Sequence, residues 1–459
     1  MPLIKSISGF RGTIGGKTGA NLTPEDIVSS VAGYADWLLR SGATPKVVIG
    51  RDGRPSGAVV SALTAATLQS MGIDVIDCGH ATTPTVEMAV KTRGAGGGII
   101  LSASHNPKEY NALKLLNAEG EFISHEAGQD LINTVESGNI TYAEVDDLGT
   151  IQHDTTALED HIEAILDHSL VQVEAIRNAG FRIVLDAVNS VGAISIPPLC
   201  EALGVECTVM NGTVNGQFAH NPEPLPAHLQ DLIAEVKTSG ADLGVAVDPD
   251  VDRLALVGPG GQWIGEEYTL VTVADYVLGL EPGPVVSNLS SSRALADLAK
   301  AHGQPYYASA VGEVNVVAKM KEVQATIGGE GNGGIIDPRL HYGRDSLIGL
   351  ALVLSHLATS KKSINELRGL YAHYEMVKDK ISLEHELDLS EALYAMEALY
   401  PDVPKSNIDG LKLDFPDGWV HLRGSNTEPI VRVYAEAASQ ARAQELAGGV
   451  KARFIEMTQ

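Results

Sequence analysis

The sequence predicts an α/β protein with three similar α/β domains and a smaller α+β domain at its C-terminal end. Apolar runs typical of strands alternate with apolar-periodic stretches typical of helices, and this strand–helix–strand order occurs three times. The length of 459 residues also suits three or four domains, at roughly 100–200 residues per domain.

Each of the three repeats begins with a short apolar strand, continues through a helix and a Gly, and ends in a second strand. Helices that link strands in this order favour parallel strands joined by right-handed crossovers. The first strand and the helix of each repeat are expected at 47–50 and 59–71, at 183–186 and 194–203, and at 285–288 and 292–302.

The last part of the chain follows a different pattern. From about Lys378 the sequence is acidic and mixed, and two strand-like runs, 419–423 and 430–434, enclose a turn-rich segment before a final helix from about Ser439. This pattern predicts the small α+β domain. We expect domain boundaries near residues 150, 255 and 370, and the four domains are then 1–150, 151–255, 256–370 and 371–459.

The composition restricts the partners of the protein. The chain has 33 Lys and Arg against 58 Asp and Glu, a formal net charge of −25, so we expect neither nucleic acid nor a membrane as a partner. An anionic substrate would need a few loops with clustered Arg and Lys. The three cysteines have no disulfide or zinc spacing, and no signal peptide or membrane span is recognisable. The cytoplasm is the expected location.

The polar segment Ser102–Pro107 directly follows an apolar run, which is where α/β proteins place ligands. Ser104 has His105 beside it and Lys114 a few residues later. A serine needs a base or a strong electrostatic field to act as a nucleophile. From this segment alone, an ordinary Ser-Asn-Pro turn stays open as the alternative.

Asp248, Asp250 and Asp252 follow another strand-like run. Three carboxylates at alternate positions can converge on one hard cation, and oxygen-only ligation with few protein ligands favours Mg²⁺. A calcium-binding EF-hand loop would need Gly at its sixth position and a carboxylate at its twelfth, where this chain has Arg253 and Pro259. A solvated acidic turn stays open, although repulsion between the carboxylates disfavours it.

Two further loops carry polar groups. Segment 423–429 reads Arg-Gly-Ser-Asn-Thr-Glu-Pro, and Arg432 follows it; such donors can surround a phosphate, with a surface turn as the alternative. The Gly-rich segment 328–334 presents Glu330 and Asn332 and lacks the Lys-Ser/Thr ending of a P-loop. A carboxylate accepts hydrogen bonds and suits sugar hydroxyls, so this loop is a candidate sugar site, with a flexible linker as the alternative.

These four loops, together with the segment 8–13 that contains Arg11, resemble the α-D-phosphohexomutase superfamily. The resemblance covers essentially the whole chain, and the Asp-x-Asp-x-Asp-Arg and Arg-x-Ser-Asn-Thr-Glu-Pro patterns are specific. It implies three α/β domains with mixed sheets and a smaller C-terminal domain around a central cleft. It also implies that successive domains carry the phosphoserine loop, the metal-binding loop, the sugar-binding loop and the phosphate-binding loop.

The resemblance implies a role for each candidate residue. The implied catalytic residues are Ser104, which is phosphorylated in the competent enzyme, His105, Lys114 as a proton shuttle, and Arg11. The implied metal ligands are Ser104, Asp248, Asp250 and Asp252. The implied substrate contacts are Arg253, Glu330, Asn332, Arg423, Ser425, Asn426, Thr427 and Arg432. The implied cofactors are Mg²⁺ and a hexose 1,6-bisphosphate, which serves as activator and intermediate.

One segment departs from the superfamily pattern. Many members end the sugar loop with Ser-Gly-His, whose histidine is a candidate for proton transfer, whereas this chain has Asn332, Gly333 and Gly334. His341, a few residues later, is a candidate replacement. An ordinary polar loop residue is the alternative for His341.

The implied reaction moves a phosphoryl group between O6 and O1 of a hexose through phosphoserine and a bisphosphorylated sugar. Ser102 and Ala103 before Ser104 resemble phosphoglucosamine mutases, which interconvert glucosamine-6-phosphate and glucosamine-1-phosphate. A phosphomannomutase or phosphoglucomutase acting on a neutral hexose phosphate is the alternative, and a hydrolase or a binding protein stays open. The expected partner is a hexose or hexosamine phosphate, and the expected assembly is a monomer or homodimer.

Overall fold

The computed structural model describes residues 3–6, 9–383, 387–425 and 430–458. The chain forms two compact units. The first unit contains Met1–Tyr276 and Asn332–Arg368, and the second contains Val277–Gly331 and Gly369–Gln459. Among the described residues, no helix combines the length and the apolar character that spanning a bilayer requires.

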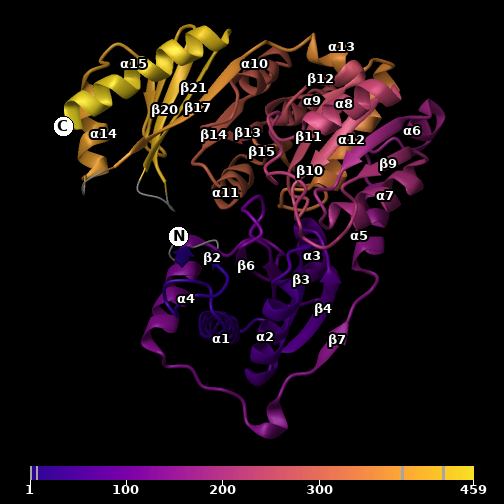
Figure 1. Cartoon of the computed structure of the whole chain (residues 1–459), viewed down its shortest axis with the longest axis vertical. Helices are drawn as coiled ribbons and strands as arrows, with labels where there is room; N and C mark the ends of the chain where they lie inside the picture. The colour runs from indigo at the N-terminus through magenta and orange to yellow at the C-terminus, as the bar shows by residue number, and fades with distance from the viewer. Residues whose placement is uncertain (1–2, 7–8, 384–386, 426–429, 459) are drawn as a thin grey trace. The chain divides into compact units, whose positions relative to one another are not determined.

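The first unit holds two sheets and their covering helices (Figure 1). Its strands are β1 (Ile4–Ser6), β2 (Gly9–Thr13), β3 (Lys46–Arg51), β4 (Asp74–His80), β5 (Gly97–Leu101), β6 (Tyr110–Leu116), β7 (Ile151–His153), β8 (Arg182–Asp186), β9 (Glu206–Met210), β10 (Leu243–Val247), β11 (Leu254–Gly258), β12 (Gln262–Trp263) and β16 (Gly334–Ile336). Its helices are α1 (Pro24–Arg40), α2 (Gly57–Ser70), α3 (Thr83–Thr92), α4 (His125–Ser137), α5 (Ala157–Leu166), α6 (Val173–Ala179), α7 (Gly192–Leu203), α8 (Gln230–Ser239), α12 (Ser346–Ser360) and α13 (Ile364–Arg368), with short 3₁₀ turns η1 (Val145–Asp147) and η2 (Pro259–Gly261). The helix α9 (Glu266–Leu280) begins in this unit, and its last residues, from Val277, are counted with the second.

The first sheet has the strand order β1-β2-β6-β5-β3-β4-β7. The strands β5, β3, β4 and β7 are parallel neighbours, and β1, β2, β6 and β5 are antiparallel neighbours. The second sheet has the order β12-β11-β10-β8-β9, with β10, β8 and β9 parallel and β11 and β12 antiparallel. Both sheets are therefore mixed.

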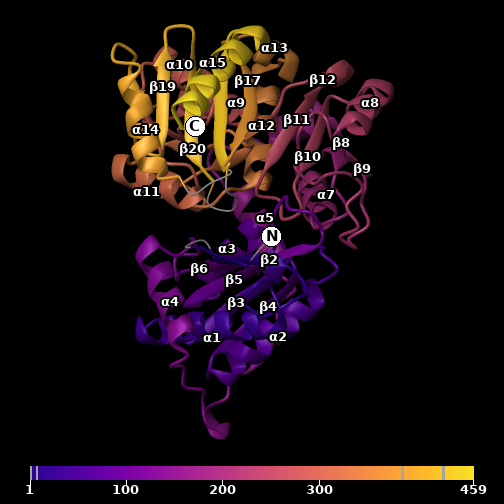
Figure 2. The same cartoon turned by 60° about the vertical axis from the view of Figure 1, so that its left-hand side comes forward.

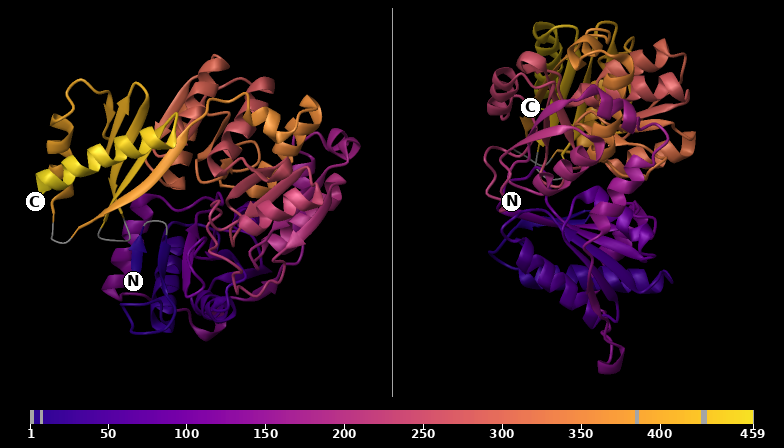
Figure 3. Two further views of the ribbon diagram at one scale, coloured as in Figure 1. Left: turned by 45° about the horizontal axis from the view of Figure 1, so that its top comes forward. Right: turned by 90° about the vertical axis from the view of Figure 1, so that its right-hand side faces the viewer.

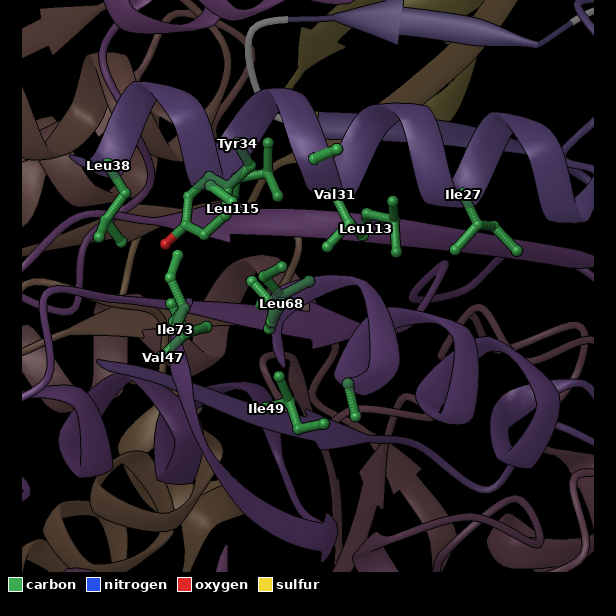
Figure 4. Close-up of a cluster of buried hydrophobic side chains, with 14 of the residues drawn as sticks. Ile27, Val31, Tyr34, Leu38, Val47, Ile49, Leu68, Ile73, Leu113 and Leu115 are labelled. Carbon is green, nitrogen blue, oxygen red and sulfur yellow. The ribbon is translucent and has the colours of Figure 1, made fainter. Parts of the chain in front are cut away.

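The core of the first sheet follows from the two-residue period of its strands. Val47 and Ile49 of β3 belong to one buried cluster, whereas Val48 belongs to a second cluster with Val86 and Val90 of α3. Figure 2 shows α1 and α2 on one side of this sheet and α3 on the other. The first cluster also includes Ile27, Val31, Tyr34 and Leu38 of α1, Leu68 of α2, and Leu113 and Leu115 of β6 (Figure 4).

The start of α12 is fixed by the side chain of Asp345. Its carboxylate accepts hydrogen bonds from the backbone N–H groups of Leu347 at 2.8 Å and Ile348 at 3.4 Å, which are otherwise unsatisfied at a helix N-terminus. Residues Ser346–Leu357 of this helix are buried all round, as expected for a helix without a polar face. The cap holds the preceding segment, which reaches the candidate site described below.

The second unit also contains two sheets. Its strands are β13 (Val285–Asn288), β14 (Tyr306–Ser309), β15 (Ile327–Glu330), β17 (Glu375–Ser382), β18 (Lys405–Ser406), β19 (Leu411–Phe415), β20 (Gly418–Gly424) and β21 (Ile430–Ala437). Its helices are α10 (Arg293–Ala301), α11 (Glu313–Val323), α14 (Leu389–Ala398) and α15 (Gln440–Thr458). The strand β13 is parallel to both β14 and β15.

The C-terminal sheet is antiparallel and has the order β17-β21-β20-β19-β18. Figure 3 shows α15 lying across this sheet. Ala443, Val450 and Phe454 of α15 are buried against the inner residues Val420 and Val433. This arrangement confirms the final helix and the two predicted strands, whereas β17, β18 and β19 were not predicted.

Candidate active site

The loops that follow strands β5 and β10 come together in the first unit. Ser104 follows the end of β5, and Asp248 follows the end of β10. The neighbouring strand β6 supplies Lys114, and β2, which is paired with β6, supplies Arg11. The structure therefore brings together side chains that lie far apart in the sequence.

Ser104 is held in an unusual backbone conformation. Its φ is +49°, in the left-handed region that costs a non-glycine residue about 1–2 kcal/mol. The residue is 3% exposed, and its Oγ donates a hydrogen bond to Asp248 Oδ2 at 2.6 Å. Ser104 is thus a buried hydroxyl that the backbone aims at the aspartate cluster.

Asp248, Asp250 and Asp252 form a fully buried cluster, with one carboxylate oxygen of each within 4.8 Å of the others. The Asp248 Oδ1 atom accepts from the backbone N–H groups of Asp252 and Arg253, both at 3.2 Å. Val251, between Asp250 and Asp252, has a φ of +64°. The loop therefore turns its three carboxylates toward one point.

The other two aspartates each use one oxygen for neighbouring donors. Asp250 Oδ2 accepts from Thr83 Oγ1 at 2.7 Å and from Lys114 Nζ at 2.5 Å. Asp252 Oδ2 accepts from Arg344 Nη2 at 2.7 Å and lies 3.3 Å from Lys114 Nζ. Such contacts to the outer oxygens orient the carboxylates of metal sites.

The remaining oxygens fit a cation. Oδ1 of Asp250 and Oδ1 of Asp252 are buried and have no hydrogen-bond partner among the described residues. A buried carboxylate oxygen without a donor is costly, and a hard divalent ion with oxygen ligands would satisfy it. The cluster is therefore a candidate metal site whose donor set fits Mg²⁺, with Ser104 Oγ beside it.

The pKa values of the three carboxyl groups shift in different directions. Burial and the charges of Asp252 and Asp250 raise the pKa of the Asp248 carboxyl well above its ordinary value. Burial acts in the same direction at Asp250 and Asp252, but Lys114 and Arg344 outweigh it and hold the pKa of these carboxyls below the ordinary value. A cation would offset the repulsion that remains.

Lys114 is a buried ammonium group. Burial acts to lower the pKa of Lys114, but the adjacent Asp250 and Asp252 outweigh burial and raise this pKa. The side chain therefore carries its proton in this arrangement. Before it could accept a proton, as the predicted shuttle role requires, Lys114 would have to leave the two carboxylates.

Arg11, His105 and Arg253 lie around the same cluster. Arg11 Nη1 donates to Asn106 Oδ1 at 2.7 Å, and Arg253 Nε lies 3.7 Å from Asp252 Oδ1. Burial, followed by the charges of Arg253 and Arg11, lowers the pKa of His105 well below its ordinary value. Both burial and these two cations therefore disfavour a charged imidazole at His105.

His341 contacts two carboxylates. Its Nε2 lies 3.3 Å from Asp345 Oδ2, and its Nδ1 lies 3.4 Å from Glu87 Oε2. Asp345 Oδ2 also contacts His161 Nε2 at 2.9 Å, so the two histidines and Asp345 form a second buried cluster. These contacts connect α3 and α5 with the start of α12.

The predicted phosphate loop lies in the second unit. Arg423 of β20 is directly opposite Arg432 of β21, and like charges in such a pair are destabilising. Arg423 Nη1 lies 3.4 Å from Asp409 Oδ2, and Arg432 Nη1 donates to Tyr434 Oη at 3.1 Å. Arg432 Nε is buried without a hydrogen-bond partner among the described residues. A bound anion would stabilise the pair.

The other predicted substrate contacts are divided between the units. Glu330 Oε1 accepts from Asn288 Nδ2 at 2.7 Å and from the Gly312 N–H at 3.1 Å in the second unit. The Ser425 N–H donates to the Ile430 carbonyl at 3.0 Å in the second unit. In the first unit, Asn332 Oδ1 accepts from the Gly334 N–H at 3.2 Å. Asn426 and Thr427 lie outside the described residues.

Four residues of the site were missed from the sequence: Asp52, Arg54, Thr83 and Arg344. Asp52 and Arg54 directly follow the apolar strand β3, so the signal that identified Ser104 was available for them as well. No local sequence pattern indicates that Thr83 or Arg344 belongs to a site. Only the folded chain shows that they contact the aspartate cluster.

Four family models match the chain in succession. They are described as phosphoglucomutase/phosphomannomutase alpha/beta/alpha domains I, II and III, over residues 4–140, 159–261 and 265–374, and the C-terminal domain of the same family, over residues 376–452.

Relatives in other organisms match almost the whole chain. A Thermococcus kodakarensis protein named phosphoglucomutase/phosphomannomutase is 35% identical over 439 residues, which cover 95% of this chain and 96% of the relative. A Sulfurisphaera tokodaii protein named phosphoglucosamine/phosphogalactosamine mutase is 32% identical over 444 residues, which cover 94% and 95%. The solved structure of a phosphoglucomutase/phosphomannomutase family protein from Burkholderia thailandensis matches with a TM-score of 0.86 and 27% identity, covering 99% of this chain and 97% of that one.

The matches agree with three α/β/α domains that have mixed sheets, followed by an antiparallel C-terminal domain. The predicted fold class is thereby confirmed. This chain belongs to the phosphoglucomutase/phosphomannomutase family of phosphohexomutases, within the α-D-phosphohexomutase superfamily.

Proposed function

We propose that this protein is a phosphoglucosamine mutase that interconverts glucosamine-6-phosphate and glucosamine-1-phosphate through phospho-Ser104. The observation that carries the phosphoryl relay is the 2.6 Å contact between Ser104 Oγ and Asp248, in a buried cluster that has two further oxygens without hydrogen-bond donors. The hydroxyl that would carry the phosphoryl group therefore lies beside a candidate cation site. Mg²⁺ bound there would offset the charge that builds on the phosphoryl oxygens.

In the proposed reaction, the bond between phosphorus and Ser104 Oγ breaks while a bond forms to the free hydroxyl of the sugar monophosphate. The sugar hydroxyl gives its proton to a base, and Ser104 Oγ takes up a proton as its bond to phosphorus breaks. In the second half, the bond between the other phosphorus and its sugar oxygen breaks while a bond forms to Ser104 Oγ, which loses its proton as the sugar oxygen gains one. Lys114, Arg11 and Arg253 are the proposed cations around the transferring group. Asp248, Asp250 and Asp252 are the proposed metal ligands.

The second unit is proposed to hold the rest of the substrate. The opposed pair Arg423 and Arg432 supports binding of the phosphate that is not transferred, together with Ser425, Asn426 and Thr427 of the same loop. Glu330 and Asn332 are the proposed contacts to sugar hydroxyls. A hexose 1,6-bisphosphate is the proposed activator. The three cysteines are free thiols, which suits the proposed cytoplasmic location.

Two candidate substrates are supported. The residues Ser102 and Ala103 and several relatives named as phosphoglucosamine mutases favour the amino sugar. The Thermococcus kodakarensis relative named phosphoglucomutase/phosphomannomutase, at 35% identity, favours a neutral hexose. The second candidate function is therefore a phosphomannomutase or phosphoglucomutase with the same relay.

The test compares kcat/KM for glucosamine-6-phosphate, mannose-1-phosphate and glucose-1-phosphate with the same Mg²⁺ and bisphosphate activator. We expect the amino sugar to be favoured by at least about tenfold, the effect of about 1.4 kcal/mol in transition-state binding. A clear preference for a neutral hexose would select the second candidate. Release of inorganic phosphate as fast as isomerisation would contradict both mutase functions, and Ser104→Ala provides the inactive control.

A further inference from the structure

The turn Asp52-Gly53-Arg54, directly after β3, surrounds the loop that carries Ser104. We propose that Arg54 and Asp52 are positioning residues that fix the backbone of Ser104 for phosphoryl transfer. The inference rests on the proposed function, because it assigns these residues a role in placing the phosphorylated hydroxyl. Neither residue touches the reacting atoms in this role, since both act through the serine loop.

The side chain of Arg54 is completely buried, with a side-chain exposure of 0%. A guanidinium group has five N–H donors in a rigid plane, and here each donor has an acceptor. The acceptors are Asp52 Oδ2 at 2.9 Å and the backbone carbonyl oxygens of Ser104, Asn106 at 2.8 Å, Pro107 at 2.7 Å and Tyr110 at 3.0 Å. Four of the five bonds therefore shape one loop.

Asp52 holds the same loop through Ser102. Ser102 Oγ donates to Asp52 Oδ2 at 2.7 Å and accepts from the Ser104 N–H at 2.9 Å. Arg54 donates directly to the Ser104 carbonyl, and the Ser104 N–H is linked to Asp52 through Ser102. Both backbone polar groups of Ser104 are therefore held by residues of this turn. A left-handed non-glycine residue persists only where its surroundings over-determine the conformation, and these contacts provide that constraint.

The turn also contacts the loop of the aspartate cluster. The Gly53 N–H donates to Ser190 Oγ at 3.0 Å, and Ser190 Oγ donates to the Pro249 carbonyl at 2.6 Å. A Cβ on Gly53 would lie 3.1 Å from both Cα and Oγ of Ser190, so the approach is close. One turn thus sets the position of Ser104 and, through Ser190, of the segment between Asp248 and Asp250.

The alternative is that Arg54 only stabilises the fold. A purely stabilising residue would change the folded fraction and leave the rate of the folded enzyme unaltered. A positioning residue would lower the rate of the folded enzyme, because a misplacement of about 1 Å costs about 100-fold in rate. The two roles therefore differ in a measurable way.

The experiment follows the half-reaction in which hexose 1,6-bisphosphate transfers a phosphoryl group to Ser104, by intact-protein mass spectrometry. Arg54→Lys keeps the charge but has three donors in place of five, and we expect the maximal rate at saturating bisphosphate to fall about 100-fold. Circular dichroism and the thermal unfolding midpoint should show that the variant is folded at the assay temperature. The matched control is Arg51→Lys at the end of β3, just before the turn, whose guanidinium contacts His80 at 2.5 Å, and it should retain the wild-type rate.

Ser102→Ala is the second variant, because it removes one hydroxyl and keeps the core intact. It removes the hydrogen bonds to Asp52 and from the Ser104 N–H, and it should slow the half-reaction at least about tenfold, the effect of about 1.4 kcal/mol. If Arg54→Lys does not fold, Ser102→Ala decides the question alone. Wild-type rates in the folded variants would overturn the positioning role while leaving the mutase function intact. Failure of wild type to become phosphorylated at Ser104 would overturn both.

Discussion

At the scale of single residues, Gly334 and Arg344 depend on each other. A Cβ on Gly334 would lie 2.3 Å from Arg344 Cδ and 2.9 Å from Arg344 Cγ. The same arginine donates to Asp252 Oδ2 at 2.7 Å and is nearly buried. Because residue 334 is a glycine, there is room beside it for the arginine that orients a candidate metal ligand.

We predict that Gly334→Ala displaces Arg344 from Asp252 and weakens Mg²⁺ binding about tenfold, as the loss of an outer-shell partner does. Arg344→Ala should have a similar effect by removing the same contact. The double variant should then bind Mg²⁺ about as well as either single variant, since contacting residues are not additive. Calorimetric titration of the four proteins measures this coupling, and two independent, additive losses would contradict it.

The candidate residues were predictable where one contiguous pattern carried them. The segments containing Ser104 and Asp248–Asp252 combine unusual residues at fixed spacing directly after apolar runs. Arg344 and Thr83 reach the same cluster from distant parts of the chain, and no local pattern distinguishes them from surface residues. Their contacts are products of the tertiary fold. The catalytic and binding roles of all these residues stay predictions.

At the scale of elements, strands and helices with strong apolar periodicity were predictable, whereas the charged edge strand β17 was not. The predicted strand 285–288 and helix 292–302 correspond to β13 and α10. In contrast, β17 lies at the edge of the C-terminal sheet and contains the exposed run Lys378–Lys380. Charged residues are common on edge strands, and they hide the alternating pattern by which strands are recognised.

The strand β20 joins two parts of the second unit through His421. His421 Nδ1 contacts Ser290 Oγ at 2.9 Å, next to β13, and Nε2 contacts the Asp409 carbonyl at 2.5 Å. The residue is 1% exposed, and burial is the main cause that lowers its pKa from 6.5 to about 4. The folded state thus holds a neutral imidazole.

This burial makes the stability of the C-terminal sheet depend on pH. Between pH 6.5 and 4 the unfolded state binds a proton at His421 and the folded state does not, so stability falls as pH falls. We expect this one group to remove about 3 kcal/mol by pH 4, at about 1.4 kcal/mol per pKa unit. The contribution is present in full above pH 6.5.

Trp419, buried in β20, reports the transition. Unfolding is followed by its fluorescence with Trp37 and Trp263 replaced by Phe. His421→Gln should show a weaker loss of stability with falling pH than this background, whereas His373→Gln, at an exposed histidine, should show the same loss. Equal pH dependence in the background and in His421→Gln would disprove the assignment.

At the scale of the whole molecule, two compact units differ from the four domains expected from the sequence. The boundaries predicted near 150 and 255 fall within the first unit. Long-range contacts join the segments on either side of both boundaries: Ser104 contacts Asp248 across the first, and Arg344 contacts Asp252 across the second. Composition and periodicity reveal the repeats, but they cannot reveal polar contacts between repeats. The three boundaries stay a prediction.

The same contacts predict where Mg²⁺ stabilises the protein. The candidate metal site and the donors that orient it lie in the first unit. An ion that binds only the folded site at about 100 times its Kd adds about 2.7 kcal/mol of stability. In hydrogen exchange, Mg²⁺ should therefore slow amides in segments 102–106 and 248–253 and at the start of α3 by up to about 100-fold. Amides of β19–β21 in the second unit should exchange at unchanged rates, and EDTA should reverse the protection.

The control variant is Asp250→Asn. It preserves the shape of the side chain but removes the charge of a carboxylate whose Oδ1 has no hydrogen-bond partner among the described residues, so it should abolish the effect of Mg²⁺. Protection of equal size in both units, or protection that survives in Asp250→Asn, would show that Mg²⁺ acts elsewhere.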